Sequence, residues 1–229
     1  MFKTYYTATL SACLALAQTC AAQAQDADQA AQAQDADQNG WYLRGGPVGV
    51  FFSPGAELSV GGAPFPGADV SVDDNYSLTF DIGYRINPQL SATFTFGIPP
   101  TAEIRGEGSL AGAYLGDVTY APAILALQYR IPTRNPKFEP YVGAGINYTI
   151  ILDSEGQDVA GFEAENAWGA VLQVGFESMI NERMGMYFDV KKIWLNADVS
   201  GTLGVGGPSA TGSATLDPLV VGTGLVWRF

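Results

Sequence analysis

The segment Leu219-Val-Val-Gly-Thr-Gly-Leu-Val-Trp-Arg-Phe229 decides the fold of this chain. Every second residue counted back from Phe229 belongs to a large, mainly apolar set, and the positions between them are small except for Arg228. A period of two is the pattern of a β-strand. The aromatic residues lie at one end of the large face, where the headgroup boundary of a bilayer would hold them. The segment therefore predicts a membrane-spanning strand, and a strand of an ordinary sandwich is the alternative.

The first residues carry the pattern of a secretory signal peptide. Lys3 precedes a short apolar run over residues 7–17, and Ala22-Gln23-Ala24 matches the small-x-small cleavage pattern. This run is too short to span a bilayer as a helix, and no later run is long enough. We therefore expect a signal peptide over residues 1–24. Any membrane span must then be part of a closed barrel, because lipid tolerates no unpaired backbone edge.

The segment between this signal and residue 41 has no means of forming a folded core. The sequence Ala-Ala-Gln-Ala-Gln-Asp-Ala-Asp-Gln occurs at 21–29 and again at 30–38. A polar, acidic segment without aromatic residues does not bury enough apolar surface to fold. We expect residues 25–40 to be a disordered acidic repeat leader and residues 41–229 to form a single domain.

The single domain contains eight candidate strands, each long enough to cross a bilayer at a tilt. The connections between them alternate between short turns and long loops, which is typical of outer-membrane barrels with the short turns in the periplasm. The sequence therefore predicts an all-β fold, an eight-stranded antiparallel transmembrane β-barrel with both termini periplasmic. The expected strands are residues 41–52, 76–86, 89–98, 118–131, 138–152, 166–180, 185–199 and 215–229, and the expected long loops are 53–75, 99–117, 153–165 and 200–214.

Alternation along most strands separates a lipid-facing set of residues from an inward set. The strand over residues 185–199 departs from this pattern, because Lys192 falls on the lipid-facing parity, where a charge is costly. A β-bulge near Lys191 and Lys192 would restore the phase and turn Ile193 and Leu195 outward. We therefore expect a bulge at this point.

The charged residues and the missing residue types exclude several functions. The net charge of −12 argues against nucleic-acid binding. The chain contains no histidine, and both of its cysteines lie within the expected signal peptide. A Ser-His-Asp arrangement is therefore impossible, and the mature chain offers neither a cysteine nucleophile nor an imidazole metal ligand. We expect no enzyme activity, no catalytic residues, no cofactor and no metal site.

Four segments of the domain resemble the OmpW family of small outer-membrane barrels. The most specific is Pro136-Lys-Phe-Glu-Pro-Tyr-Val-Gly-Ala-Gly-Ile-Asn-Tyr-Thr149, which looks like the fifth strand of that family. Residues 41–46, 122–130 and 189–196 are similar to its first, fourth and seventh strands, and the Phe-terminated end fits as well. The resemblance implies an outer-membrane location in a Gram-negative bacterium. It also implies transport of small hydrophobic molecules, from outside into an apolar pocket and then sideways into the bilayer.

The inward residues are compatible with this route, because an eight-stranded barrel is either filled by side chains or holds one small ligand. Toward the long loops the inward candidates are apolar, and toward the short turns they are charged. We expect an apolar pocket above an ion-paired plug that blocks axial passage. The pocket candidates are Val50, Phe52, Ile124 and Val171, and the plug candidates are Asp81, Arg85, Glu177, Asp189, Lys191 and Arg228.

Two further readings concern the partners of the barrel. Bacterial barrels commonly end in Phe, so Trp227 and Phe229 are expected to form a signal for the barrel insertion machinery. The acidic long loops favour a structural or interaction barrel as the alternative to transport, one whose loops contact lipopolysaccharide or other cells. The expected partners are therefore outer-membrane lipid and lipopolysaccharide, the insertion machinery and a small hydrophobic solute.

Overall fold

The computed structural model describes residues 40–203 and 207–229. The expected signal peptide and nearly all of the expected leader lie outside these residues, and Gly40 already belongs to the first strand. The described residues include no helix with the length and apolar character needed to cross a membrane.

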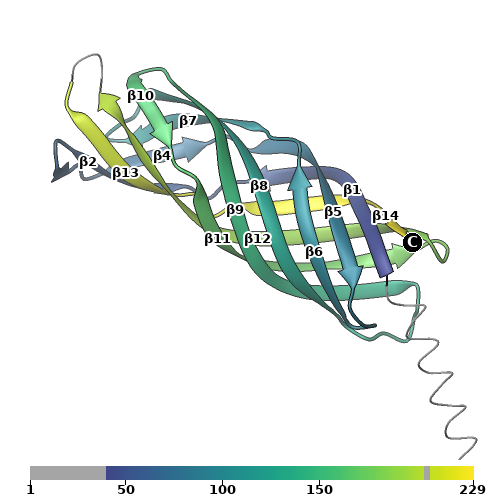
Figure 1. Cartoon of the computed structure of the whole chain (residues 1–229). Helices are drawn as coiled ribbons and strands as arrows, with labels where there is room; N and C mark the ends of the chain where they lie inside the picture. Colours follow the sequence, from purple (N-terminus) through teal and green to yellow (C-terminus); the bar gives the residue numbers. More distant parts are fainter. Residues whose placement is uncertain (1–39, 204–206) are drawn as a thin grey trace, which may run out of the picture. The chain divides into compact units, whose positions relative to one another are not determined.

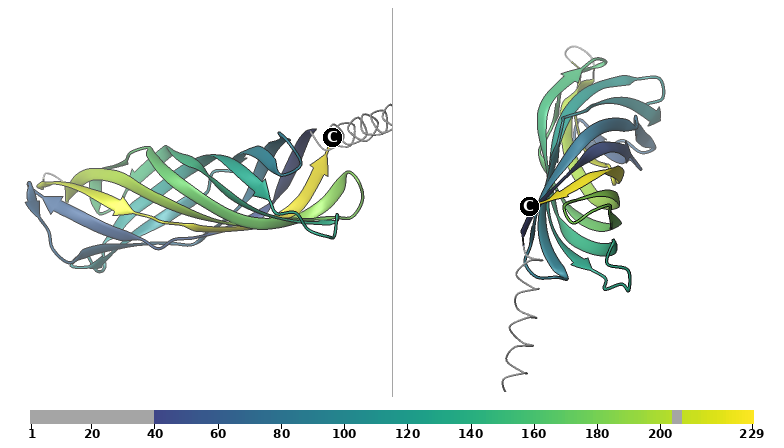
Figure 2. Two further views of the ribbon diagram at one scale, coloured as in Figure 1. Left: turned by 90° about the horizontal axis from the view of Figure 1, so that it is seen from below. Right: turned by 90° about the vertical axis from the view of Figure 1, so that its right-hand side faces the viewer.

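Eight antiparallel strands form a closed ring (Figures 1 and 2). Each strand pairs with the next along the ring, and the last pairs with the first, from Tyr42 opposite Arg228 to Phe51 opposite Leu219. The predicted eight-stranded barrel is therefore confirmed. The ring consists of β1 (Gly40–Phe51), β5 (Asn75–Arg85), β6 (Leu90–Gly97), β8 (Tyr114–Arg130), β9 (Phe138–Gly156), β11 (Ala167–Met179), β12 (Met184–Leu203) and β14 (Leu219–Arg228).

Short turns join the strands at one end of the barrel, here called the turn end. Asparagine side chains organise these turns, because their oxygens accept hydrogen bonds from nearby backbone N–H groups. The Asn87 Oδ1 accepts from Leu90 at 2.7 Å, and the Asn181 Oδ1 accepts from Met184 at 2.8 Å. The backbone N–H of Phe229 donates to the Trp41 carbonyl at 3.1 Å, so the last residue lies at this end too.

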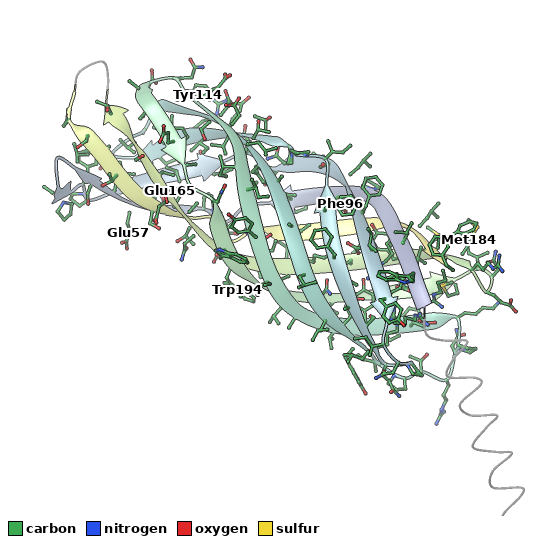
Figure 3. All side chains as sticks on the ribbon, viewed as in Figure 1. Glu57, Phe96, Tyr114, Glu165, Met184 and Trp194 are labelled. Atoms are coloured by element: carbon green, nitrogen blue, oxygen red, sulfur yellow. The ribbon has the colours of Figure 1, made fainter. Side chains whose placement is uncertain are left out.

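The outer surface of the ring is apolar, as the alternation predicts. Leu125, Leu127 and Val174 are each more than half exposed, whereas their strand neighbours point inward and are buried. Figure 3 shows Phe96 and Trp194 among the side chains of the wall. An exposed apolar surface that runs around a whole barrel is the surface that lipid tails require.

The expected bulge in β12 is wrong. Its pairing with β11 runs in unbroken register through Lys191 and Lys192, and Ile193 and Leu195 point inward and are buried. Lys192 keeps its outward position, and its ammonium group donates a hydrogen bond to the carbonyl of Asp217. The strand therefore keeps its phase, because a backbone acceptor partners the outward cation near the end of the β12–β14 pairing.

The four expected long loops contain further strands, so they are more ordered than loops. They form what we call the extension, in which small strands pair with one another and with the ends of β8 and β12, while β8 and β9 continue to pair with each other. Figure 3 labels Glu57, Tyr114 and Glu165 in this part. The small strands are β2 (Gly55–Val60), β3 (Ala63–Pro64), β4 (Ala68–Val72), β7 (Thr101–Gly108), β10 (Val159–Ala164) and β13 (Ser209–Thr215).

Candidate functional site

A buried carboxylate lies near four arginines in the turn-end half of the barrel. Glu177, on β11, is fully buried. Its oxygens lie 2.5 Å from Arg228, 3.3 Å from Arg130, 3.6 Å from Arg85 and 3.8 Å from Arg44. The four arginines come from four different strands, so this one carboxylate links distant parts of the ring.

A second carboxylate lies on the turn-end side of the same arginines. Glu139, near the start of β9, lies 2.5 Å from Arg85, 2.8 Å from Arg228 and 3.3 Å from Arg130. A buried charge is tolerated only when it is paired and hydrogen-bonded. Two carboxylates shared among several guanidinium groups meet that requirement.

A chain of polar contacts extends this network toward the middle of the barrel. Arg44 donates to the hydroxyl of Tyr141 at 2.6 Å, and that hydroxyl donates to Asp189 at 2.6 Å. Asp189 also accepts from Lys191 at 2.5 Å, and Asp81 lies 3.3 Å from Arg44. The ionic groups connected in this way are here called the charged cluster, which comprises Arg44, Asp81, Arg85, Arg130, Glu139, Glu177, Asp189, Lys191 and Arg228.

All six residues named from the sequence as an ion-paired plug lie in the charged cluster, and three members were missed. The three are Arg44, Arg130 and Glu139. The sequence contains a signal for two of them. Arg44 lies two residues after Tyr42 and Arg130 two residues after Gln128, so each shares the inward side of its strand with that residue. The first strand's phase was not fixed by its own sequence, since Gly45, Gly46 and Pro47 interrupt the alternation.

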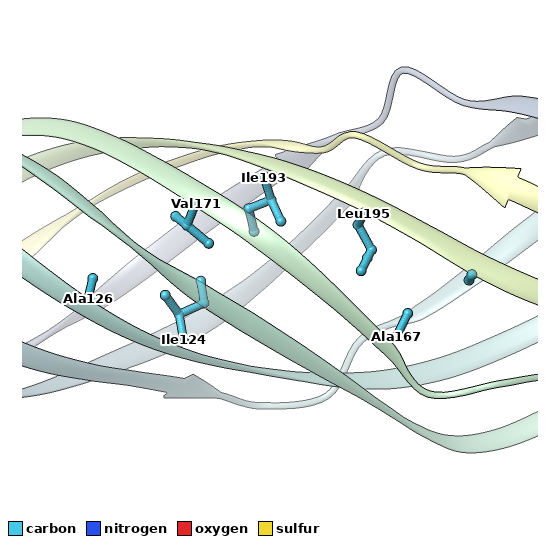
Figure 4. Packing of buried hydrophobic residues seen from close by; sticks show 7 residues of the cluster. Ile124, Ala126, Ala167, Val171, Ile193 and Leu195 are labelled. Atoms are coloured by element: carbon cyan, nitrogen blue, oxygen red, sulfur yellow. The ribbon is translucent and has the colours of Figure 1, made fainter.

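An apolar cavity of about 110 Å³ lies above the charged cluster, toward the extension. Val50, Phe52 and Ile124 line it, as does Leu216. The fourth pocket candidate, Val171, does not line the cavity and is 1 % exposed. It packs with Ile124 in the buried cluster of Figure 4.

The cavity continues into the extension. A smaller cavity of about 60 Å³ lies there. The two share Ile104, Val199 and Leu216 among their lining residues. The buried side chains of this region form an apolar cluster that includes Val70 and Phe162. An apolar environment therefore extends from the middle of the barrel into the strands beyond it.

The barrel wall is interrupted beside the cavity. The pairing of β6 with β8 ends at Thr95 opposite Ile124, and the pairing of β7 with β8 begins at Thr101 opposite Thr119. Among the residues that the structure describes, 96–100 have no paired partner on β8. This unpaired part of the wall is here called the wall gap.

Prolines lie on both sides of the wall gap. The backbone N–H of Tyr120 donates across it to the carbonyl of Pro100 at 3.2 Å. The next residue of the same parity on β8 is Pro122, which has no N–H to donate. Phe96 and Ile98 have exposed side chains on the outer surface, and both also line the cavity. Phe96 and Ile98 therefore belong both to the outer surface and to the lining of the cavity.

The described residues hold no group of three or more Asp, Glu, His or Cys side chains arranged to bind a metal ion. The chemistry of the interior is thus that of ion pairs and hydrogen bonds at one end and of apolar contacts at the other.

Curated relatives share most of the chain. It is 38 % identical over 189 residues to the "Dibenzothiophene metabolism operon protein PahQ" of Pseudomonas aeruginosa, which covers 82 % of this chain and 88 % of the relative. It is 33 % identical over 174 residues to "Outer membrane protein AlkL" of Ectopseudomonas oleovorans, covering 76 % and 74 % of the two chains.

Solved structures agree with the fold. The crystal structure of the outer membrane protein OprG from Pseudomonas aeruginosa matches with a TM-score of 0.78 at 23 % identity, covering 83 % of this chain and 96 % of that one. The solution structure of Outer Membrane Protein W from E. coli matches with a TM-score of 0.58 at 27 % identity, covering 83 % and 98 %. The family model of the OmpW family matches residues 41–229. The chain therefore belongs to the OmpW family, whose barrels are known as non-enzymatic membrane proteins, and it resides in the outer membrane of a Gram-negative bacterium.

Proposed function

We propose that this barrel passes small hydrophobic molecules from outside the cell toward the bilayer, through the apolar cavity and out sideways at the wall gap. One arrangement supports the proposal: an apolar cavity lies above the charged cluster, and its lining includes Phe96 and Ile98, which are exposed on the outer surface beside the wall gap. An apolar solute is stabilised in the cavity but not among buried ion pairs, so axial passage is closed to it.

The proposed path has three parts. We place the extension outside the cell and the turn end in the periplasm, which sets the direction of the path. A solute enters between the apolar side chains of the extension and rests beside Val50, Phe52 and Ile124. It leaves past Phe96 and Ile98, which line the cavity and are exposed on the outer surface.

The names of relatives support this solute class. The relative PahQ is named for a dibenzothiophene metabolism operon. Dibenzothiophene is a fused aromatic compound of low polarity, for which the polar surface of an outer membrane is a barrier. For this barrel we propose, correspondingly, transport of an apolar compound of similar or smaller size.

The role of the cavity in transport is tested by Phe52→Asp. A carboxylate in the cavity wall makes binding of an apolar solute unfavourable, because the charge finds no partner in the solute. We expect uptake of toluene by cells producing the variant to fall to the level of cells without the protein, with normal amounts of folded barrel. The matched control is Phe65→Asp, since Phe65 is exposed in the extension. Equal uptake with and without the wild-type protein would instead favour a structural barrel whose acidic loops contact lipopolysaccharide or other cells.

The wall gap is tested by Pro122→Val, which returns a backbone N–H to the β8 edge of the gap. Pro122 also lines the cavity, so binding of toluene to the purified barrel is measured alongside, and we expect uptake to fall several-fold and by more than binding does. Unchanged uptake would contradict the lateral exit and leave the cavity in place.

The barrel insertion machinery is a further proposed partner. Trp227 and Phe229 form the outward aromatic end of β14 and are both exposed. We expect deletion of Phe229 to lower assembly in the outer membrane, measured as the fraction of heat-modifiable barrel on a gel. Unchanged assembly would contradict the role of this end as an insertion signal.

A further inference from the structure

The wall of the cavity is apolar, but its floor is not. Asn147 on β9 and Lys191 on β12 both line the cavity, and neither side chain is more than a tenth exposed. If the cavity bound only hydrocarbons, apolar residues would be expected at these two positions as well. The neighbouring inward positions on β12 are apolar, since Ile193 and Leu195 occupy them. The polar floor therefore needs an explanation of its own.

Asn147 has a polar atom without a partner. Its amide nitrogen donates to the hydroxyl of Thr149 at 2.8 Å, and its carbonyl oxygen accepts no hydrogen bond. A hydroxyl can donate or accept, so either orientation of the amide leaves one of its two polar atoms unpaired. Buried polar groups are nearly always hydrogen-bonded, and an exception calls for a water molecule or a ligand.

Lys191 offers donors on the same floor. One of its three N–H groups is directed to Asp189, at 2.5 Å between Nζ and Oδ1. An ammonium group has three donors, so two remain for a molecule in the cavity. The floor thus combines an unpaired amide atom with a cationic donor, beneath an apolar wall.

We propose that the cavity takes an apolar molecule carrying one hydroxyl group, with the hydroxyl placed at the floor formed by Asn147 and Lys191. A hydroxyl can donate a hydrogen bond to the amide oxygen of Asn147 and accept one from the ammonium group of Lys191. The cavity of about 110 Å³ and the adjoining cavity of about 60 Å³ together slightly exceed the cavity of about 150 Å³ that holds benzene in another protein, so they suit a molecule near the size of one aromatic ring. This inference rests on the proposed function and specifies its substrate class.

The experiment compares p-cresol with toluene, which differ by one hydroxyl group. Binding of each probe to the full barrel in lipid nanodiscs is measured by equilibrium dialysis, with empty nanodiscs subtracted. The variant Asn147→Leu removes the polar amide at nearly constant volume. Comparing each probe between wild type and variant cancels its own partition into lipid.

We expect the Kd of p-cresol to rise about three- to tenfold in Asn147→Leu, the effect of one hydrogen bond, while the Kd of toluene stays the same or falls. The matched control is Asn196→Leu, because Asn196 is exposed on β12. It is expected to change neither Kd. An unchanged Kd for p-cresol, or an equal change for both probes, would overturn the hydroxyl site and leave the proposed transport standing.

Two further results separate the inference from the proposed function. If wild type binds neither probe, the cavity is no ligand site and both proposals fail. If Asn147→Leu does not fold, the side-chain amide signal of Asn147 is followed in the wild-type protein by NMR. Its shift is expected to be larger with p-cresol than with toluene, because only p-cresol adds a hydrogen bond to the ring-current shift that either ring causes. Equal shifts with the two probes, or no shift with either, would contradict the site.

Discussion

The two halves of the barrel interior differ although the same strands build both. On β12 the inward residues change from Asp189 and Lys191 to Ile193 and Leu195 over consecutive inward positions. On β8 they change in the same direction, from Arg130 to Ile124. The outer surface stays apolar along both strands as far as Lys192, whose ammonium group is bound to the Asp217 carbonyl. The inward face alone therefore sets what each half does, and the outward face only has to satisfy lipid.

The comparison also shows two ways of filling a small barrel. The turn-end half is closed by charges that hold each other across the ring, and no single strand supplies enough of them. The half toward the extension is lined by apolar residues that leave a cavity. Removing one partner from a network of buried charges leaves the other charges without compensation. Removing a group from an apolar wall costs only the contacts of that group and the space it leaves.

The largest expected effect breaks the charged half. Glu177→Gln keeps the shape of the side chain but removes a charge near four arginines. Breaking a buried ion pair costs about 3–5 kcal/mol, so we expect a loss of unfolding free energy of that size. It is measured by urea unfolding of the barrel in lipid vesicles with tryptophan fluorescence.

The matched control for this variant is Glu182→Gln, since Glu182 is exposed in the turn after β11. We expect a change within about 0.5 kcal/mol there. Equal, small losses for both variants would show that the charged cluster does not hold the barrel together. The apolar half should still bind toluene in the folded fraction of Glu177→Gln.

A smaller effect is expected at the boundary between the halves. Val171→Ala removes buried methyl groups from the cluster with Ile124, for a loss of about 2 kcal/mol including the cavity it leaves. Val174→Ala, on the lipid-facing side of the same strand, should cost about 1 kcal/mol less, because lipid tails fill the space. Equal losses would mean that the interior collapses around the missing group and that the cavity is not rigid.

The smallest effect concerns an ionisable pair on the extension, outside both halves. The hydroxyl of Tyr114 donates to Asp117 at 2.7 Å, and this bond, with help from the negative charge, raises the pKa of Tyr114 to about 12. The raised pKa stabilises the fold below pH 10, and this contribution is lost as the pH rises from about 10 to about 12.

This pair is checked by following the Tyr114 ring carbons by NMR during a pH titration. Asp117→Asn should return the pKa of Tyr114 toward its ordinary value near 10. A wild-type Tyr114 that already titrates near 10 would contradict the hydrogen bond.

The sequence predicts the wall of this barrel better than its interior. Alternation along β14, from Leu219 to Phe229, is a local pattern, and lipid enforces it at every second position. The ion pairs of Arg44 and Arg130 depend on strands that are far apart in the sequence, so no local pattern reveals them. Glu139 precedes Pro140 at the start of its strand, where alternation gives little guidance.

Two other differences have definite causes. The bulge expected at Lys192 is absent because the carbonyl of Asp217 partners the outward ammonium group, a contact between residues 25 positions apart. The segment over residues 200–214 was expected to be a long loop, yet β12 continues to Leu203 and pairs with β10 and β13. Pairing partners supplied by other loops extended the sheet beyond the membrane-spanning part.

The most direct test of an open half above a closed half is a crystal structure of the barrel soaked with iodobenzene, whose iodine gives an anomalous signal. The account predicts a peak in the cavity beside Val50, Ile124 and Leu216, and none among Glu177 and its arginines. A cavity without a peak, or a peak within the charged cluster, would contradict it.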